Sequence, residues 1–185
     1  MKEIRWHGRG GHGGFTAARL LGMAASVYGN YYAQAFPSFG PERRGAPVLG
    51  FTRVDNKPIH DHSKVYTCDY VVVLDESLLE TIDVKEGLKK GGTLLINSIL
   101  SPDKFKDSED YNVHTIDATS LALEVLGVPV TNTAMLGALV AVADFVSLEA
   151  VLQAIERSMP KELQEKNKKV VKMAYEKLRE GKIHA

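Results

Sequence analysis

Cysteine is almost absent from this sequence, because Cys68 is the only one in 185 residues. A single thiol cannot form an internal disulfide, and an iron–sulfur cluster needs about four thiolates. Any cluster that serves this protein must therefore be carried by another chain. Cys68 directly precedes an apolar run, which predicts a buried, inert side chain at the start of a strand, with a reactive thiol as the alternative.

The chain also lacks an excess of charge of either sign and lacks a long apolar run. Lysine plus arginine and aspartate plus glutamate both number 23, so the formal net charge is +0. This balance predicts no attraction to nucleic acid or to a membrane surface. No apolar stretch approaches the roughly 18 residues of a membrane span, and residues 1–14 have no signal-like apolar core. We therefore expect a cytoplasmic protein.

Apolar runs of strand length alternate with segments of helical periodicity. Strands are expected at residues 4–7, 31–36, 48–54, 69–75, 93–97 and 113–117, and helices at 15–28, 76–88, 133–145, 148–158 and from Pro160 onward. This alternation predicts an α/β fold, a three-layer α/β/α sandwich with a mostly parallel Rossmann-like sheet and a helical C-terminal third. No linker or repeat interrupts the chain, so residues 1–185 are expected to form a single domain.

The expected helix at 133–145 is rich in small residues. Gly137, Ala138 and Ala141 would let the backbone of a neighbouring element approach closely. In the helix after Pro160 the apolar residues form one stripe, and the Lys and Glu residues on its other face predict a solvated surface.

Glycines cluster between the first expected strand and the first expected helix. The run Gly8-Arg9-Gly10-Gly11-His12-Gly13 satisfies G-x-G-x-x-G in the context that a dinucleotide site requires. Backbone amides and an arginine at a helix N-terminus favour a phosphate-sized anion. A dinucleotide site also needs an acidic residue about 20 positions further on, and none occurs between Glu3 and Glu42. The loop predicts an anion site for another cofactor or partner, with NAD(P) binding and a ligand-free turn as alternatives.

Other polar segments leave the expected strands at their carboxyl ends. These segments are 8–14, 37–47, 75–77, 97–98 and 117–120, and residues 131–133 precede a helix. Because open α/β sheets bind ligands beyond these strand ends, we expect the segments to gather at one edge. Helix capping by itself explains most of their Ser, Thr and Asp residues.

Segment 38–47 is less easily explained as a solvated turn. It contains Phe39, Glu42, Arg43 and Arg44 among glycines and prolines. Arginine forks recognise carboxylates and phosphates, and aromatic and arginine side chains are favoured at protein interfaces. The segment therefore predicts an interface or ligand-binding role.

No catalytic or metal-binding constellation can be identified. His60 and His62 flank Asp61 in a possible strand, which would place both imidazoles on one side. No third ligand accompanies them with convincing spacing, so no metal site is expected and their role stays open. The sequence predicts no catalytic residue on this chain.

Three segments together resemble the gamma subunit family of pyruvate and 2-oxoacid:ferredoxin oxidoreductases. They are residues 4–13 with the glycine loop, residues 39–47 (Phe-Gly-Pro-Glu-Arg-Arg-Gly-Ala-Pro), and residues 132–138, which begin with Asn132. Their order and spacing are similar to the family's, and the resemblance covers essentially the whole chain. His12 stands where many members have Gln, and Arg43 stands where Val is common.

The resemblance implies membership of an enzyme complex. The family's enzymes oxidatively decarboxylate a 2-oxoacid, most often pyruvate, form an acyl-CoA and pass electrons to ferredoxin. It implies thiamine diphosphate and Mg²⁺ between the alpha and beta subunits, and [4Fe-4S] clusters on beta and delta. The gamma domain would cover the active site and help to hold coenzyme A. The loop from Gly8 to Gly13 would bind a CoA phosphate, and Arg43 and Arg44 would face another subunit or the CoA.

Two other functions share some of these features. A stand-alone NAD(P)-binding oxidoreductase would share the glycine loop, although the acidic residue is missing. A non-catalytic regulatory or assembly protein would use the anion site without belonging to an enzyme complex. On the favoured hypothesis, the isolated chain neither reduces ferredoxin nor consumes pyruvate.

Overall fold

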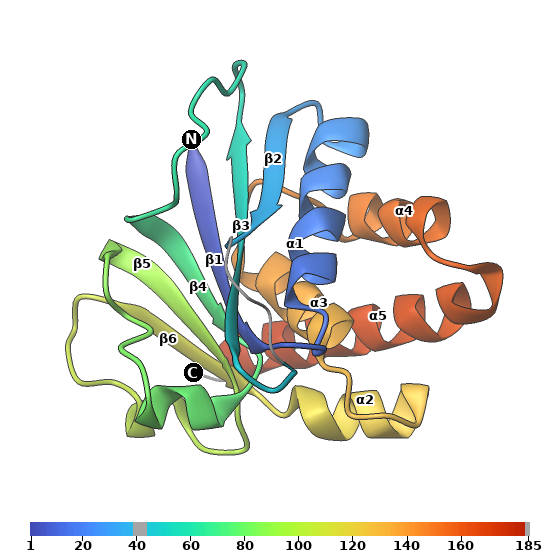
Figure 1. The fold of residues 1–185 in the computed structure, drawn as a ribbon. Helices are drawn as coiled ribbons and strands as arrows, with labels where there is room; N and C mark the ends of the chain where they lie inside the picture. The colour runs from blue at the N-terminus through green and yellow to red at the C-terminus, as the bar shows by residue number, and fades with distance from the viewer. Residues whose placement is uncertain (39–43, 184–185) are drawn as a thin grey trace.

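The computed structural model, which describes residues 1–38 and 44–183, contains one six-stranded sheet (Figure 1). The strands are β1 (Lys2–Arg9), β2 (Tyr32–Pro37), β3 (Pro47–Asp55), β4 (Cys68–Val73), β5 (Leu88–Asn97) and β6 (Asn112–Ile116), in the spatial order β2-β3-β1-β4-β5-β6. Strands β1, β4, β5 and β6 pair in parallel, whereas β3 is antiparallel to both β1 and β2. The expected α/β class with a mostly parallel sheet is confirmed, but the α-helices lie on one face of the sheet and not on both, as a three-layer α/β/α sandwich would require.

Helices cover one face of this sheet. They are α1 (Gly14–Met23), which continues into a π-helical turn η1 (Ala24–Tyr28), α2 (Ala118–Leu126), α3 (Asn132–Val142), α4 (Leu148–Ser158) and α5 (Lys161–Ile183). Figure 1 shows α1, α3, α4 and α5 on the same side of the strands. The larger hydrophobic core lies between these helices and the sheet, and it includes Trp6, Leu21, Leu95 and Met135.

The central helix α3 is buried on every side, since 10 of its 11 residues are buried. A helix that is apolar all round belongs in a core. At Gly137 a Cβ atom would lie 2.9 Å from both the carbonyl carbon and the Cα of Val171 in α5. The close backbone approach expected of this glycine is confirmed.

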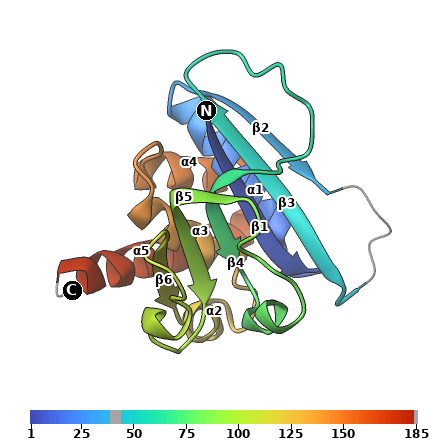
Figure 2. The same ribbon diagram turned by 90° about the vertical axis from the view of Figure 1, so that its left-hand side faces the viewer.

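The other face of the sheet is covered by irregular segments and two 3₁₀ turns, η2 (Glu76–Glu80) and η3 (Pro102–Lys104) (Figure 2). Buried side chains such as Val65 and Val84 pack there against Val71 and Ile96 of the sheet. The expected helix at 76–88 is wrong, because only the turn η2 forms before Gly87 adopts φ 73° and β5 begins at Leu88.

Two further local expectations need correction. Helix α2 was not expected, although Asp117 caps it through a 2.9 Å bond from the Ser120 amide and Gly127 ends it with φ 76°. His60 and His62 lie in an irregular, exposed segment and not in a strand. The buried Arg53 holds this segment by donating to the carbonyl oxygen of Asp61 at 3.0 Å.

Candidate functional site

Segments distant in the sequence meet in a crevice at the carboxyl ends of the parallel strands. The crevice has a volume of about 490 Å³. It is lined by residues that include His12 of the glycine loop, Asp75 after β4, Asn97 at the end of β5, Asp117 before α2 and Thr131 before α3. The expected gathering of polar segments at one edge is confirmed for these five. Parallel sheets bind ligands at this edge.

Asn97 organises the centre of the crevice. Its Nδ2 donates to the carbonyl oxygen of Leu74 and to Oγ1 of Thr119, both at 2.9 Å. Its Oδ1 accepts from the amide of Ala118 at 3.0 Å and from that of Thr119 at 3.2 Å. Asp117 also accepts from the amide of Ser120, so the backbone amides at the N-terminus of α2 find their acceptors within the protein itself. This helix end is therefore satisfied without a ligand.

The N-terminus of α1 differs from that of α2. Its N-cap is Gly13, in the left-handed conformation with φ 73°, and no side chain among the described residues caps it. A Cβ atom added at Gly11 or Gly14 would meet nothing within 4 Å, so the space beside the loop is open. An uncapped helix start with open space beside it can accept an anion.

The structure brings parts of the three family-like segments together. The amide of Gly10 donates to the carbonyl oxygen of Ala46 at 2.9 Å, and the amide of Gly45 donates to that of Gly10 at 3.2 Å. Nδ2 of Asn132 donates to the carbonyl oxygen of Gly13 at 3.3 Å. Arg44 is exposed beside the loop, opposite Gly10. Phe39, Glu42 and Arg43 lie outside the described residues.

Arg9 links the glycine loop to the segment after β4 and to the loop before β3. Its guanidinium donates to Oδ2 of Asp75 at 2.8 Å, to Oγ of Ser77 at 2.7 Å and to the carbonyl oxygen of Gly45 at 3.0 Å. Burial alone would raise the pKa of Asp75, but the hydrogen bonds from Ser77 and Arg9 outweigh it and hold that pKa below its ordinary value. The expected anion-binding positions therefore fall into two groups. Gly8 and Arg9 belong to strand β1, and the Arg9 side chain is occupied by its partners within the chain. Residues 10–13 remain exposed or half-exposed.

Arg5 and His7 on β1 form a polar pair that the sequence interpretation missed. Both are buried, and Nε of Arg5 donates to Nε2 of His7 at 3.0 Å. Burial and, secondly, the charge of Arg5 lower the pKa of His7 from 6.5 to about 3. The available signal was the alternation of Arg5 and His7 with Ile4 and Trp6, which puts the polar pair on one face of a strand.

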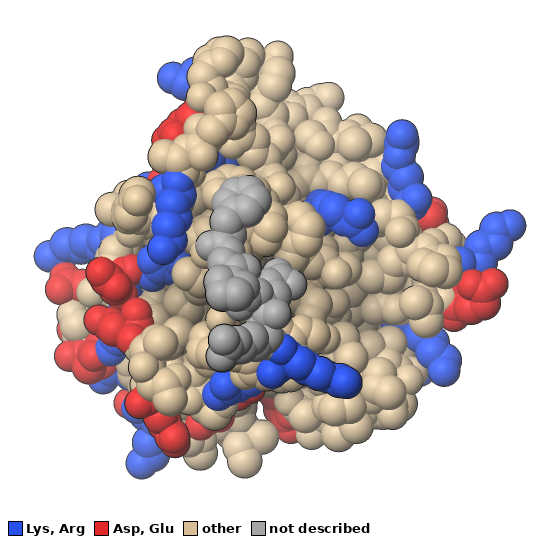
Figure 3. All heavy atoms as spheres, in the orientation of Figure 1, with Lys and Arg blue, Asp and Glu red and all other residues tan. Residues whose placement is uncertain are grey.

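The described residues offer little else to a charged or metallic ligand. In residues 1–38 and 44–183, no three His, Cys, Asp or Glu side chains are grouped as a metal ion would require. Burial raises the pKa of the Cys68 thiol to about 11, as expected for an inert cysteine. Positive and negative side chains are mixed on the face seen in Figure 3. None of the helices in the described part of the chain is long and apolar enough to cross a membrane.

Comparison with known proteins places the chain in a family. The model of the pyruvate ferredoxin/flavodoxin oxidoreductase family matches residues 3–177. Pyruvate synthase subunit PorC of Methanothermobacter thermautotrophicus is 48% identical over 184 residues, which cover 100% of this chain and 99% of that one. The common gamma subunit of the pyruvate/ketoisovalerate oxidoreductases of Pyrococcus abyssi is 49% identical over 180 residues, with 96% and 97% covered.

A solved structure agrees with these relatives. The crystal structure of pyruvate oxidoreductase subunit PORC from Thermotoga maritima superposes with a TM-score of 0.81 at 39% sequence identity, covering 95% of each chain. Fold, family model and sequence identity extend over nearly the same residues, so the match is not confined to the glycine loop. The chain belongs to the gamma subunit family of pyruvate and 2-oxoacid:ferredoxin oxidoreductases.

Proposed function

We propose that this chain is the gamma subunit of a cytoplasmic complex that oxidatively decarboxylates a 2-oxoacid to an acyl-CoA and passes the electrons to ferredoxin. Alpha, beta and delta subunits would complete the complex. Pyruvate is the favoured substrate, because the relative from M. thermautotrophicus is named a pyruvate synthase subunit. The P. abyssi relative is named as common to pyruvate and ketoisovalerate oxidoreductases. Because that relative is shared by oxidoreductases for two 2-oxoacids, we expect other subunits to determine which 2-oxoacid the complex uses.

The redox and decarboxylation chemistry would reside on the partner chains. Bound thiamine diphosphate with Mg²⁺ would supply the carbanion chemistry of decarboxylation, and [4Fe-4S] clusters would carry the electrons. Cys68 is the only thiol in the sequence and it is buried, so this chain has no ligand set for a cluster. Its own part would be to help enclose the active site and to bind coenzyme A.

The observation that carries the coenzyme A proposal is the uncapped start of α1. The amides of Gly10 and His12 donate to carbonyl oxygens of the chain itself, so the amides left for a ligand are those of Gly11, Gly13 and the first turn of α1, beside open space and next to the crevice at the strand ends. A phosphate group of CoA would accept from these amides and interact with the positive end of the helix dipole. Arg44 lies beside the loop and is exposed, so it is positioned to add a charged hydrogen bond.

Membership of the complex is tested by co-purification. The tagged chain, expressed together with the alpha, beta and delta subunits of its own organism, should retain chains that contain iron and thiamine diphosphate. The retained complex should reduce ferredoxin with pyruvate and coenzyme A, whereas the isolated chain should not. Turnover of a 2-oxoacid by the isolated, metal-free chain would refute the proposal.

The coenzyme A site is tested at Thr16, the third residue of α1. Glutamate at this position reaches back to the N-cap amide and stabilises the helix while placing negative charge where the phosphate would bind. In the complex, Thr16→Glu should raise KM for coenzyme A about tenfold, which corresponds to about 1.4 kcal/mol. Thr16→Gln is the matched neutral control. An unchanged KM for coenzyme A in Thr16→Glu would contradict the assignment, and KM for the 2-oxoacid should stay constant in both variants.

A further inference from the structure

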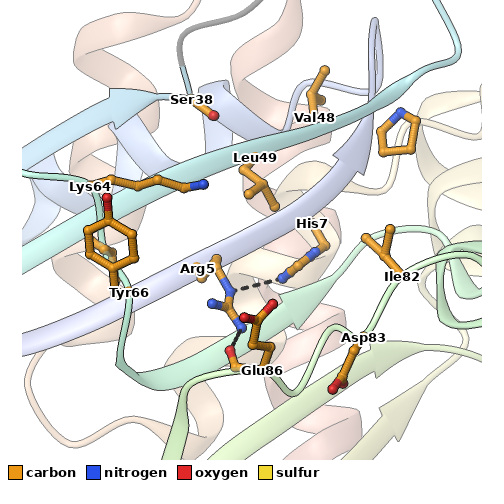
Figure 4. Close-up of a pocket in the computed structure, with 12 residues that line it drawn as sticks. Arg5, His7, Ser38, Val48, Leu49, Lys64, Tyr66, Ile82, Asp83 and Glu86 are labelled. Carbon is orange, nitrogen blue, oxygen red and sulfur yellow. Dashed lines mark hydrogen bonds between the residues drawn. The ribbon is translucent and has the colours of Figure 1, made fainter.

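A second cavity lies on the face of the sheet that carries no α-helix. Its volume is about 570 Å³, and its lining residues come from β1, Ser38 after β2, the start of β3 and the segments 64–66 and 82–86 (Figure 4). Arg5 and His7 of β1 form part of its floor, and Val48, Leu49 and Ile82 supply apolar surface. This cavity is separate from the crevice at the strand ends, since the two share no lining residue.

Arg5 is a buried cation without a carboxylate partner. Its side chain is only 7% exposed, and its hydrogen bonds run to Nε2 of His7 and to the carbonyl oxygens of Val84 and Glu86. No ion pair joins it to any described residue. The other deeply buried arginine, Arg53, is paired with Glu3 at 3.0 Å. A buried guanidinium is normally paired, so Arg5 lacks a counter-charge that the rest of the molecule would lead one to expect.

His7 adds a hydrogen-bond donor that also lacks an acceptor. A guanidinium can only donate, so Nε2 of His7, which accepts from Arg5, carries no proton. The burial of the ring keeps it neutral, and the single ring proton therefore resides on Nδ1. Nδ1 is buried and has no partner in the described part of the chain. Leaving a buried donor unmatched is unfavourable, so an acceptor supplied from outside these residues would stabilise His7.

The mouth of the cavity carries charges of both signs. Lys64 is exposed on one side, with no ion-pair partner among the described residues, and Asp83 and Glu86 are exposed on the other. On the floor, in contrast, the hydrogen-bonding groups that Arg5 and His7 still have free are all donors. An anionic group that reaches the floor would be attracted by Arg5 and Lys64. It would be repelled by Asp83 and Glu86 only while it passes the mouth of the cavity.

We propose that this cavity receives an aspartate or glutamate side chain from a partner subunit, whose carboxylate accepts hydrogen bonds from Arg5 and His7. The inference rests on the proposed function, because it requires that the chain be part of a complex. The cavity is much larger than one carboxylate group and has an apolar wall, so it also accommodates neighbouring residues of the inserted segment. The sheet face that carries no α-helix would thereby contact another subunit in the assembly.

The test measures how strongly this full-length chain binds the remaining subunits at low ionic strength. Lys64→Met removes a positive charge at the mouth and should weaken binding severalfold, whereas Glu86→Gln removes a negative charge and should strengthen it severalfold. Both side chains are exposed, so both variants should fold. Lys172→Met on the helical face is the matched control and should leave the affinity unchanged. His7→Phe replaces the imidazole by a somewhat larger apolar ring and removes both the Nδ1 donor and the Nε2 acceptor of Arg5, and it should weaken binding about tenfold.

The opposite signs of the two rim variants distinguish the possible occupants. Strengthening by Lys64→Met and weakening by Glu86→Gln would indicate a cationic occupant and overturn the inference. No change in either rim variant, with wild-type binding intact, would overturn it while the proposed function stands. Sodium butyrate, a small carboxylate with a short apolar tail, provides a further check. If it stabilises the isolated wild-type chain and not His7→Phe, while the rim variants leave assembly unchanged, the occupant is a free carboxylate and not a subunit. A wild-type chain that binds no partner would refute both the proposed function and this inference.

Discussion

Substitution of Gly137 by alanine probes the closest helix contact of the fold. The added Cβ would lie 2.9 Å from the carbonyl carbon and Cα of Val171, nearly an ångström inside ordinary van der Waals contact. The obstacle is backbone, so it cannot rotate away, and α3 and α5 must move apart. Overpacking of this kind costs about 3 kcal/mol. The higher helix propensity of alanine offsets about 1 kcal/mol, which leaves a net loss of about 2 kcal/mol.

The assay is equilibrium unfolding in urea, followed by circular dichroism, together with thermal melts. For a domain of this size 1 kcal/mol corresponds to about 2–4 °C, so Gly137→Ala should lower Tm by about 4–8 °C. Gly181→Ala in α5 is the matched control, because a Cβ atom there meets nothing within 4 Å. It should leave Tm unchanged or raise it by about 2 °C. If Gly137→Ala were as stable as the wild type, the packing of α3 against α5 described above would be wrong.

Two further predictions concern buried titratable groups. The pKa of His7 falls from 6.5 to about 3 on folding. Between these values the unfolded chain binds the additional proton. The stability due to neutral His7 is therefore complete above 6.5 and is lost as the pH falls toward 3, by about 1.4 kcal/mol per pH unit. Thermal melts from about pH 7 to about pH 4.5 should show this slope in the wild type and a shallower one in His7→Phe, and equal slopes would contradict the assignment. Cys68, whose pKa burial raises to about 11, should resist iodoacetamide at neutral pH in the folded chain and react once the chain is unfolded in urea. Rapid labelling of the folded chain would show that the thiol is accessible.

Much of the fold could be predicted from local patterns. Continuous apolar runs such as 70–74 specify buried strands, and the glycine loop before residue 15 specifies a strand-to-helix turn. The family was also accessible from sequence, because three separated segments carry its marks in order. The missed helix α2 had readable caps in Asp117 and Gly127, so that error was one of interpretation.

Other features depended on contacts between residues far apart in the chain. The segment 76–88 has residues that a helix tolerates, but it folds as a short turn, and its apolar side chains pack on the sheet face that carries no α-helix. Arg9 was expected to bind an anion, and the structure gives it Asp75 as a partner 66 residues away. Pairing at such separation is decided by strand order, which local sequence does not encode.

The sequence by itself determined the class of fold, the family and the gathering of polar segments at the carboxyl edge, because strand alternation and parallel connection fix those consequences in advance. Only the tertiary structure decided that Arg5 and His7 are buried and that α1 begins without a side-chain cap. Burial of a side chain depends on which distant segments cover its face of the sheet, and a helix start is capped or open according to what lies beside it in space.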